Sequence, residues 1–169
     1  MNPFVVIMGV SGCGKTTIAS LLADRIPNAT FLEGDSFHPP ANKEKMGAGI
    51  PLTDEDRWLW YEALNAAARE AIASGSTPVL ACSALKESYR KVLFRGFDTY
   101  RLVFLEGSFE LIKARMDERE HEYMTSTLLE SQFATLEEPE AGETVLTVSI
   151  ENPPEEIVGT VLSWMKETT

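Results

Sequence analysis

The sequence of 169 residues has only two cysteines, Cys13 and Cys82, and their spacing suits neither a metal site nor a disulfide framework. We expect both to be reduced thiols. Positive charge is also scarce, because 15 lysines and arginines stand against 26 acidic residues, which gives a net charge of -11 at pH 7. Nucleic acids and anionic membranes select basic surfaces, so neither is expected as a partner.

Long apolar runs are missing as well. No stretch of the sequence approaches the ~20 apolar residues that a membrane span needs, and residues 4–8 lack the length and the charged flank of a secretory signal. We therefore expect a cytoplasmic protein. A hydrophobic content of 44% is enough for one substantial core, so residues 1–169 are expected to form a single domain.

The most specific motif is G-x-x-x-x-G-K-[ST], which residues 9–16 match. It follows an apolar run at residues 4–8, typical of a buried strand, and precedes a helical pattern at 17–23. The glycines of such a loop permit a tight turn whose N–H groups face phosphate, and the helix N-terminus adds partial positive charge. Lys15 is expected to reach the β- and γ-phosphates, and Thr16 to bind Mg²⁺. The predicted nucleotide site comprises Gly9, Val10, Ser11, Gly12, Cys13, Gly14, Lys15, Thr16 and Thr17.

Strands alternate with helices along the chain. Short apolar runs predict strands at residues 30–32, 78–82, 102–105 and 145–148, in addition to 4–8. Thr53 and Asp56 form a capping-box pattern at the start of an expected helix over 53–74, and Pro153-Pro154 opens a final helix with an apolar stripe. The expected apolar face of the first of these helices consists of Trp58, Tyr61, Leu64 and Ile72. This alternation predicts an α/β fold with a parallel sheet covered by helices on both faces.

Ligands of open α/β sheets bind beyond the carboxyl ends of the strands. Asp35 follows the second strand, where a carboxylate could orient an acceptor hydroxyl, accept its proton or hold a Mg²⁺-bound water. The alternative for Asp35 is a helix N-cap. His38 precedes two prolines, and its spacing favours a turn residue bonded to backbone. The third strand ends without a Walker-B aspartate, and no D-x-x-G follows the loop, which favours a small-molecule kinase over an ATPase or GTPase.

Further motifs resemble those of the small gluconate kinases over nearly the whole chain. After the phosphate loop they are Gly34-Asp35-Ser36-Phe37-His38-Pro39, Asn42, Glu44-Lys45-Met46, Gly49, Pro51-Leu52, Asp54, Asp56-Arg57, Cys82-Ser83-Ala84-Leu85-Lys86, Tyr89-Arg90, Gln132-Phe133-Ala134-Thr135-Leu136-Glu137 and Pro139. The resemblance implies a P-loop kinase with a five-stranded parallel sheet, a helical acceptor-binding region at about 36–75 and a mobile lid at about 116–128. It also implies a homodimer that transfers the γ-phosphoryl group of ATP to the 6-hydroxyl of D-gluconate with Mg²⁺.

The resemblance further implies roles for individual residues. Lys15, Asp35 and Arg119 are the expected catalytic residues, and Arg115 is expected to stack on the adenine. The expected acceptor contacts are Asp35, His38, Lys45, Arg57, Lys86, Arg90 and Gln132. Arginine forks recognise carboxylates such as that of gluconate. The lid departs from the family pattern, because Glu122 stands at the usual histidine position and His121 falls one place early.

Three other functions fit parts of the sequence. A shikimate kinase would share the fold and the loop, but such enzymes carry a glycine run where this chain has Ser83-Ala84-Leu85. A nucleoside monophosphate kinase is compatible with the fold alone. A non-catalytic ATP-binding sensor would be expected to have lost catalytic residues, whereas Lys15, Asp35 and Arg119 are all present.

Overall fold

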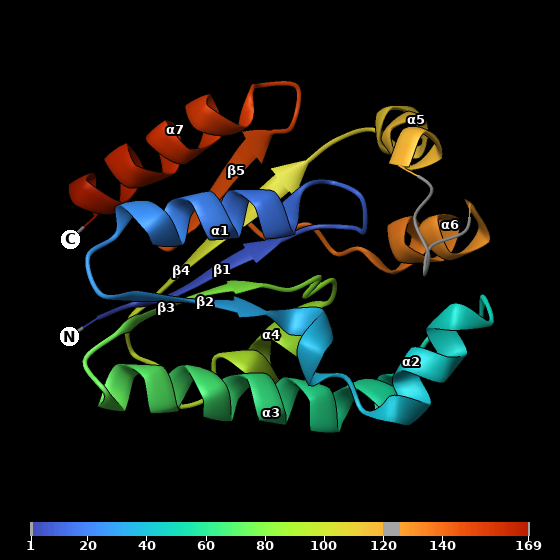
Figure 1. Cartoon of the computed structure of the whole chain (residues 1–169), viewed down its shortest axis with the longest axis horizontal. Helices are drawn as coiled ribbons and strands as arrows, with labels where there is room; N and C mark the ends of the chain where they lie inside the picture. The colour runs from blue at the N-terminus through green and yellow to red at the C-terminus, as the bar shows by residue number, and fades with distance from the viewer. Residues whose placement is uncertain (1, 120–125, 169) are drawn as a thin grey trace.

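The computed structural model of the chain describes residues 2–119 and 126–168, apart from the side chain of Arg119. Five strands form one parallel sheet in the order β2-β3-β1-β4-β5 (Figure 1). The strands are β1 (Phe4–Met8), β2 (Ala29–Glu33), β3 (Thr77–Ala81), β4 (Tyr100–Glu106) and β5 (Val145–Ser149). This confirms the predicted α/β fold and all five predicted strands, to within two residues at each end.

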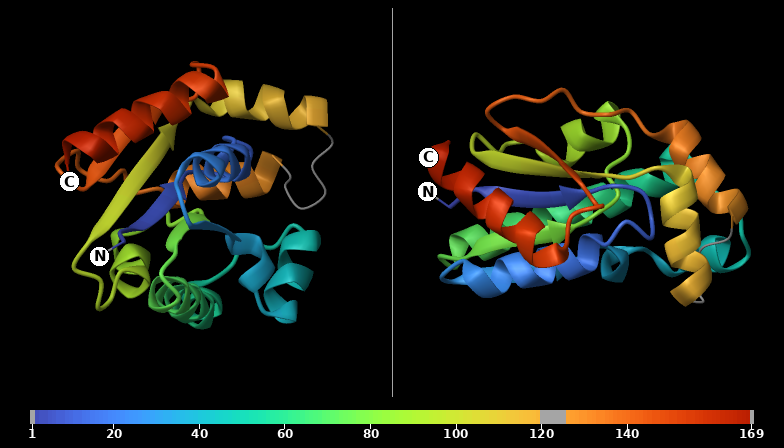
Figure 2. Two further views of the ribbon diagram at one scale, coloured as in Figure 1. Left: turned by 60° about the vertical axis from the view of Figure 1, so that its left-hand side comes forward. Right: turned by 90° about the horizontal axis from the view of Figure 1, so that it is seen from above.

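Helices cover both faces of the sheet (Figures 1 and 2). On one face lie α1 (Lys15–Arg25) and α7 (Pro154–Glu167), and on the other lie α3 (Asp54–Ala73) and α4 (Glu87–Leu93). Beyond the carboxyl ends of the strands lie the short 3-10 helix η1 (Gly34–Phe37), α2 (Pro40–Gly47), α5 (Phe109–Arg119) and α6 (Ser126–Thr135). Within the described ranges, no helix is long and apolar enough to cross a membrane.

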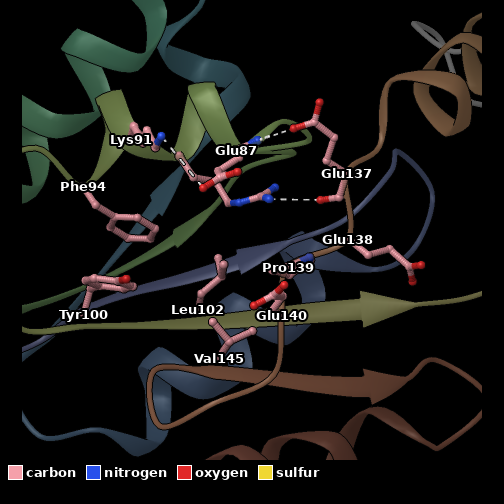
Figure 3. A pocket seen from close by; sticks show the side chains of 11 residues that line it. Glu87, Lys91, Phe94, Tyr100, Leu102, Glu137, Glu138, Pro139, Glu140 and Val145 are labelled. Atoms are coloured by element: carbon pink, nitrogen blue, oxygen red, sulfur yellow. Dashed lines mark hydrogen bonds and ion pairs between the residues drawn. The ribbon is translucent and has the colours of Figure 1, made fainter.

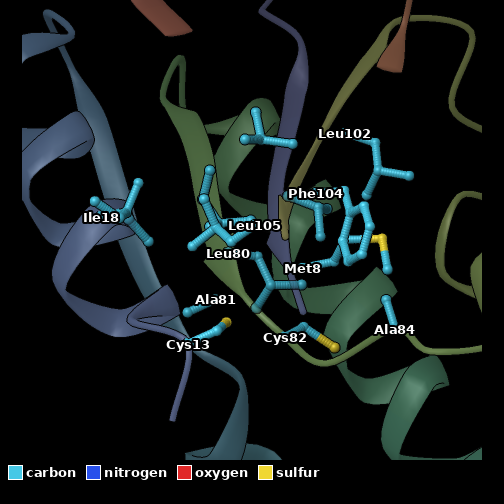
Figure 4. Close-up of a cluster of buried hydrophobic side chains, with 14 of the residues drawn as sticks. Met8, Cys13, Ile18, Leu80, Ala81, Cys82, Ala84, Leu102, Phe104 and Leu105 are labelled. Atoms are coloured by element: carbon cyan, nitrogen blue, oxygen red, sulfur yellow. The ribbon is translucent and has the colours of Figure 1, made fainter. Parts of the chain in front are cut away.

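The core lies on both faces of the sheet, around the central strand β1 and its neighbour β3. Every residue of β1 and β3 is buried, as expected for parallel strands with helices on each face. Figure 4 shows part of this core, in which Ile18 of α1 and Phe104 of β4 belong to the same buried cluster. Cys13 and Cys82 are buried here as free thiols, which confirms the expectation from the sequence.

Helix α3 begins with the predicted capping box, in which Thr53 and Asp56 exchange side-chain and backbone hydrogen bonds. Its buried face differs in part from the predicted one. Tyr61 and Leu64 are buried as expected, but Trp60 replaces Trp58 as the buried tryptophan. The reason is a tertiary contact, because the Trp60 Nε1–H donates to the Gly34 carbonyl oxygen at 2.8 Å. The apolar stripe of α7 packs in the core as predicted.

Gly34 lies where the turn after β2 meets the backbone of β3. A Cβ atom at this position would overlap the carbonyl oxygen of Ala81, well inside van der Waals contact. Gly47, in contrast, has no heavy atom within 4 Å of such a Cβ.

We expect Gly34→Ala to lower the free energy of unfolding by at least about 1–3 kcal/mol, the usual cost of forcing a methyl group into packed structure. Urea denaturation followed by circular dichroism measures this difference. Gly47→Ala is the matched control, and it should leave stability unchanged or raise it by up to about 1 kcal/mol. Equal stability of the two variants would contradict the steric role of Gly34.

Candidate active site

The phosphate loop and the turn after β2 enclose a hollow of about 180 Å³. Its lining brings together Lys15 and Thr16 of the loop with Glu33 and Asp35 of the turn. Gly14, with a φ of 99°, makes the left-handed turn that starts α1. The loop N–H groups and the N-terminus of α1 then supply positive potential for a phosphate group. The Lys15 ammonium donates to the Val10 carbonyl oxygen at 3.0 Å, within the loop itself.

Glu33 is a site residue to which the sequence analysis gave no role. It is the last residue of β2, and its Oε2 accepts a hydrogen bond from the Thr16 hydroxyl at 2.5 Å. Its other carboxylate oxygen lies 3.5 Å from the backbone N of Asp35. The signal that could have identified it is its position at a strand end, two residues before the candidate base.

Asp35 lies within η1, and its carboxylate is 80% exposed. Glu33 is the N-cap of that helix, so the N-cap alternative for Asp35 is wrong. The Asp35 Oδ1 lies 4.0 Å from the His38 Nε2. The carboxylate is therefore open to an incoming hydroxyl group, with a histidine behind it.

His38 is buried, with 6% of its surface exposed, and its ring stacks on Trp60 with centroids 3.8 Å apart. The turn interpretation holds for its backbone, whose N–H donates to the Asp35 carbonyl oxygen at 3.3 Å. Burial lowers the pKa of His38 to about 4, against a smaller opposing effect of the Asp35 charge. The imidazole is therefore neutral at physiological pH.

Two of the expected acceptor cations meet at Tyr89. The Arg57 Nη1 donates to the Tyr89 hydroxyl oxygen at 2.7 Å, and that hydroxyl donates to Asp54. The Lys86 Nζ lies 3.3 Å from the same Asp54 carboxylate and 5.5 Å from the centre of the Tyr89 ring. Burial raises the pKa of Tyr89 to about 12, whereas the hydrogen bond from Tyr89 lowers the pKa of Asp54. The cluster of Arg57, Lys86, Tyr89 and Asp54 is therefore two cations and one anion joined by a neutral phenol.

The other expected acceptor residues have different partners. Lys45 forms an ion pair with Asp56 at 2.8 Å, which, with the capping hydrogen bonds of Thr53, lowers the pKa of Asp56 to about 2. Gln132 of α6 binds the phosphate loop, because its Oε1 accepts from the Ser11 backbone N–H at 2.7 Å and its Nε2 lies 3.2 Å from the Ser11 Oγ.

Arg90 is only 8% exposed, and its guanidinium donates hydrogen bonds to backbone carbonyl groups. Its Nη1 donates to the Ala84 carbonyl oxygen at 2.8 Å and its Nη2 to the Glu137 carbonyl oxygen at 3.0 Å. Arg90 also lines a cavity of about 560 Å³ between α4, β4 and the segment after α6 (Figure 3). Glutamates dominate the charged rim of this cavity, so its volume does not make it a phosphate site; the smaller hollow at the phosphate loop has the necessary donors.

A further hollow of about 300 Å³ adjoins the outer side of the phosphate loop. It is lined by Thr17 of α1, by Arg115 of α5 and by residues 150–154 after β5. The Arg115 guanidinium donates to the Ile150 carbonyl oxygen at 2.9 Å. Arg115 therefore forms a wall of this hollow, where the expected stacking on a base would occur.

Arg119 ends α5, but its side chain lies outside the described part of the structure. Residues 120–125 of the expected lid, with His121 and Glu122, also lie outside the described residues. The role of Arg119 and the effect of Glu122 stay predictions.

The hollow at the phosphate loop has ligands that suit Mg²⁺. The Thr16 hydroxyl is one oxygen ligand, with the Glu33 carboxylate beside it. Over residues 2–119 and 126–168, no group of three His, Cys, Asp or Glu side chains forms a protein cage for a metal. Mg²⁺ usually keeps several waters and binds substrate phosphates with one or two protein oxygens, so the residues present fit this ion.

Comparisons with known proteins find similar sequences and structures over most of the chain. A family model described as an AAA domain matches residues 4–139. The gluconokinase of Gluconobacter oxydans (strain 621H) is 47% identical over 156 residues, covering 92% of this chain and 86% of that protein. The thermoresistant gluconokinase of Escherichia coli (strain K12) is 41% identical over 163 residues, covering 96% and 93%. The crystal structure of a gluconokinase from Sinorhizobium meliloti 1021 superposes with a TM-score of 0.86 at 40% identity, covering 98% and 92%.

The sheet order, the phosphate loop and the domain match define a P-loop kinase. Within that class, the identities of 41–47% over most of both chains show that the chain belongs to the gluconokinase family.

The low pKa of His38 predicts a pH dependence of stability. Because the folded-state pKa is about 4 and the ordinary pKa of histidine is 6.5, the unfolded chain binds the proton first as pH falls. The stabilisation is complete above pH 6.5 and is lost progressively towards pH 4, by at most about 1.4 kcal/mol per pH unit for one proton. The charges of Asp35, Arg57 and Lys43 act on the group in addition to burial.

Urea unfolding at several pH values measures this effect. The difference in free energy between the wild type and His38→Gln isolates His38 from carboxylates that titrate near pH 4. We expect the wild type to lose stability relative to His38→Gln as the pH falls from 6.5 to 4. Parallel plots of unfolding free energy against pH for the two proteins would contradict a buried neutral His38.

Proposed function

We propose that this protein transfers the γ-phosphoryl group of ATP to the 6-hydroxyl of D-gluconate, giving 6-phospho-D-gluconate and ADP. The observation that carries the proposal is 41–47% identity to proteins named gluconokinase over most of the chain, combined with a phosphate loop facing Asp35. This relationship favours gluconate over shikimate, and a catalytic role over a purely sensing one.

Phosphoryl transfer depends mainly on positioning and charge neutralisation. Lys15 would leave the Val10 carbonyl oxygen and bind the β- and γ-phosphates of the nucleotide. The Ser11 N–H would likewise exchange its bond to Gln132 for a phosphate oxygen. Arg119, at the end of α5, is proposed to bind the same phosphates from the lid. The hollow beside Arg115 would hold the adenine base.

Asp35 is proposed to orient the acceptor. As the 6-hydroxyl oxygen bonds to the γ-phosphorus, the bond from phosphorus to the β–γ bridging oxygen breaks and ADP leaves. The hydroxyl proton passes to the Asp35 carboxylate, which is exposed on the hollow. Product release then returns the proton to solvent.

Thr16 and Glu33 are proposed to hold Mg²⁺ on the phosphates. When bound, the ion supplies charge neutralisation for the transferring group. The Glu33 carboxylate accepts a hydrogen bond from the Thr16 hydroxyl, which leaves the lone pairs of the hydroxyl oxygen free to bind a cation. Glu33 is thus proposed to have the Mg²⁺-binding role of the Walker-B carboxylate, which the third strand lacks.

Arg57 and Lys86 are proposed to bind the gluconate carboxylate, by exchanging their present contacts with Tyr89 and Asp54. Residues 36–75 form the proposed acceptor region, and residues 116–128 the proposed lid. A homodimer and a cytoplasmic location stay predictions, and size-exclusion chromatography with light scattering tests the first.

The acceptor cluster predicts a preference for D-gluconate over D-glucose of at least about 100-fold in kcat/KM. Glucose also offers a 6-hydroxyl, but it has no carboxylate to replace the contacts that Arg57 and Lys86 make with Tyr89 and Asp54. It therefore lacks two charge-assisted interactions, which are typically worth about 1.5–3 kcal/mol each. A coupled ADP-release assay with gluconate, glucose, shikimate and AMP measures the preference.

Arg57→Ala should reduce kcat/KM for gluconate more than for glucose. Lys91→Ala is the matched control, because this lysine lies on the exposed side of α4 and pairs with Glu87. Equal kcat/KM for gluconate and glucose in the wild type would refute the proposed function.

The Thr16–Glu33 contact predicts that Glu33→Gln raises the Mg²⁺ concentration for half-maximal activity by about 10- to 100-fold, the usual effect of removing a partner of a metal ligand. Initial rates at saturating gluconate over a Mg²⁺ titration measure this. Glu62→Gln, an exposed change on α3, is the control for the loss of one negative charge. An unchanged Mg²⁺ requirement in Glu33→Gln would show that Glu33 only orders the loop.

A further inference from the structure

His38 meets the active site through one edge of its ring. One face of the imidazole stacks on Trp60, and the side chain is almost completely buried. The ring nitrogens point in different directions, because Nδ1 contacts Asn42 and Nε2 faces Asp35. A histidine held in this way can act on Asp35 only through Nε2, so its effect depends on whether Nε2 carries a proton.

The hydrogen bonds of Asn42 settle which nitrogen of His38 carries the proton. The Asn42 Nδ2 lies 2.7 Å from the Asp56 backbone carbonyl oxygen, which can only accept a hydrogen bond. The atom at this position is therefore the amide NH₂ group. The same atom lies 3.2 Å from the His38 Nδ1. With one hydrogen on Asp56, Asn42 directs its second hydrogen at Nδ1, so Nδ1 must be the acceptor.

An acceptor Nδ1 leaves the proton of the neutral ring on Nε2, the nitrogen that faces Asp35. A doubly protonated ring would turn an N–H group against the NH₂ group of Asn42. Asn42 is itself buried, with 3% exposure, so it has little freedom to turn away.

We propose that Asn42 holds His38 in its Nε2–H tautomer, and that this N–H orients the Asp35 carboxylate for the acceptor hydroxyl. Both are positioning residues for the reaction proposed above. The distance of 4.0 Å from Nε2 to Oδ1 exceeds a hydrogen bond, and such contacts in substrate-free enzymes commonly tighten when the substrate binds.

A neutral donor suits a carboxylate that must accept a proton. An imidazolium beside Asp35 would stabilise its ionised form by charge and so weaken it as a base. A neutral N–H fixes the direction of the carboxylate with a smaller effect of this kind. The charged side chains acting on His38 are Asp35, Arg57 and Lys43.

The tautomer can be read directly by ¹⁵N NMR of the substrate-free protein at neutral pH. The chain has two histidines, His38 and His121, so a His121→Gln variant assigns the signals of His38. We expect a protonated Nε2 and an unprotonated Nδ1. Asn42→Leu should release the ring into a mixture of tautomers. A protonated Nδ1 in the wild type overturns the proposal.

The pairing with Asp35 is tested in the same spectra. Asp35→Asn should shift the Nε2 signal while leaving the tautomer unchanged, whereas Glu62→Gln, which removes an exposed charge on α3, should shift neither nitrogen. Identical Nε2 shifts in the wild type and Asp35→Asn, both free and with gluconate, overturn the pairing. These spectra need no turnover, so they decide the pairing even if gluconate is not the substrate.

The effect on the reaction is tested with two substitutions of His38. The amide nitrogen of glutamine can replace Nε2–H, whereas leucine cannot donate. We expect His38→Leu to lower kcat by about 10- to 100-fold with little change in KM for ATP, and His38→Gln to recover about tenfold of that loss. Equal kcat in the two variants, with wild-type-like unfolding curves, overturns the positioning role. If the wild type does not phosphorylate gluconate, the proposed function fails. The ¹⁵N NMR spectra then decide by themselves whether His38 pairs with Asp35.

Discussion

The close approach of Gly34 to the backbone of Ala81 is the contact on which the acidic half of the site depends. Gly34 lies directly between Glu33 and Asp35, so its position sets both carboxylates relative to β3. On the other side, Trp60 donates to the Gly34 carbonyl oxygen and stacks on His38. A residue without a side chain thus lets the acidic turn lie directly against the end of β3, because no larger residue fits between the strand and the turn.

The carboxylate beside Thr16 comes from β2, and not from β3, the strand that pairs with β1. β3, next to β1, ends at the buried Ala81 and is followed by the buried Cys82, so that strand end offers no acid. β2 lies two strands from β1, about 9–10 Å away at normal strand spacing. Helix α1 packs over β2 and β3 as well as β1, which brings Thr16 at its start towards β2. The longer side chain of glutamate then completes the contact with Thr16.

Local chemistry encodes the parts of the molecule that could be predicted from the sequence. The phosphate loop, the five strands and the capping box at Thr53 depend on residues close together in the chain, and the structure confirms these elements. The hydrogen bond from Arg90 to the backbone could not be predicted from the sequence. It depends on the conformation of Ala84, whose φ of 46° is rare for a residue with a side chain. The tautomer of His38 could not be predicted either, because it depends on the Asp56 carbonyl oxygen, 18 residues further along the chain. Side-chain partners from distant segments leave no periodic signal.

The protein carries a net charge of -11, yet it is proposed to bind two anionic substrates. Three of the acceptor cations expected from the sequence are already paired internally: Lys45 with Asp56, Lys86 with Asp54, and Arg57 with the Tyr89 hydroxyl. Binding an acceptor carboxylate therefore exchanges one set of partners for another, instead of neutralising free charges. Such an exchange yields less affinity than pairing free ions would, because the internal contacts must break. It favours acceptors whose carboxylate and hydroxyl groups replace all of those contacts at once, so selectivity arises from geometry and not from a general attraction for anions.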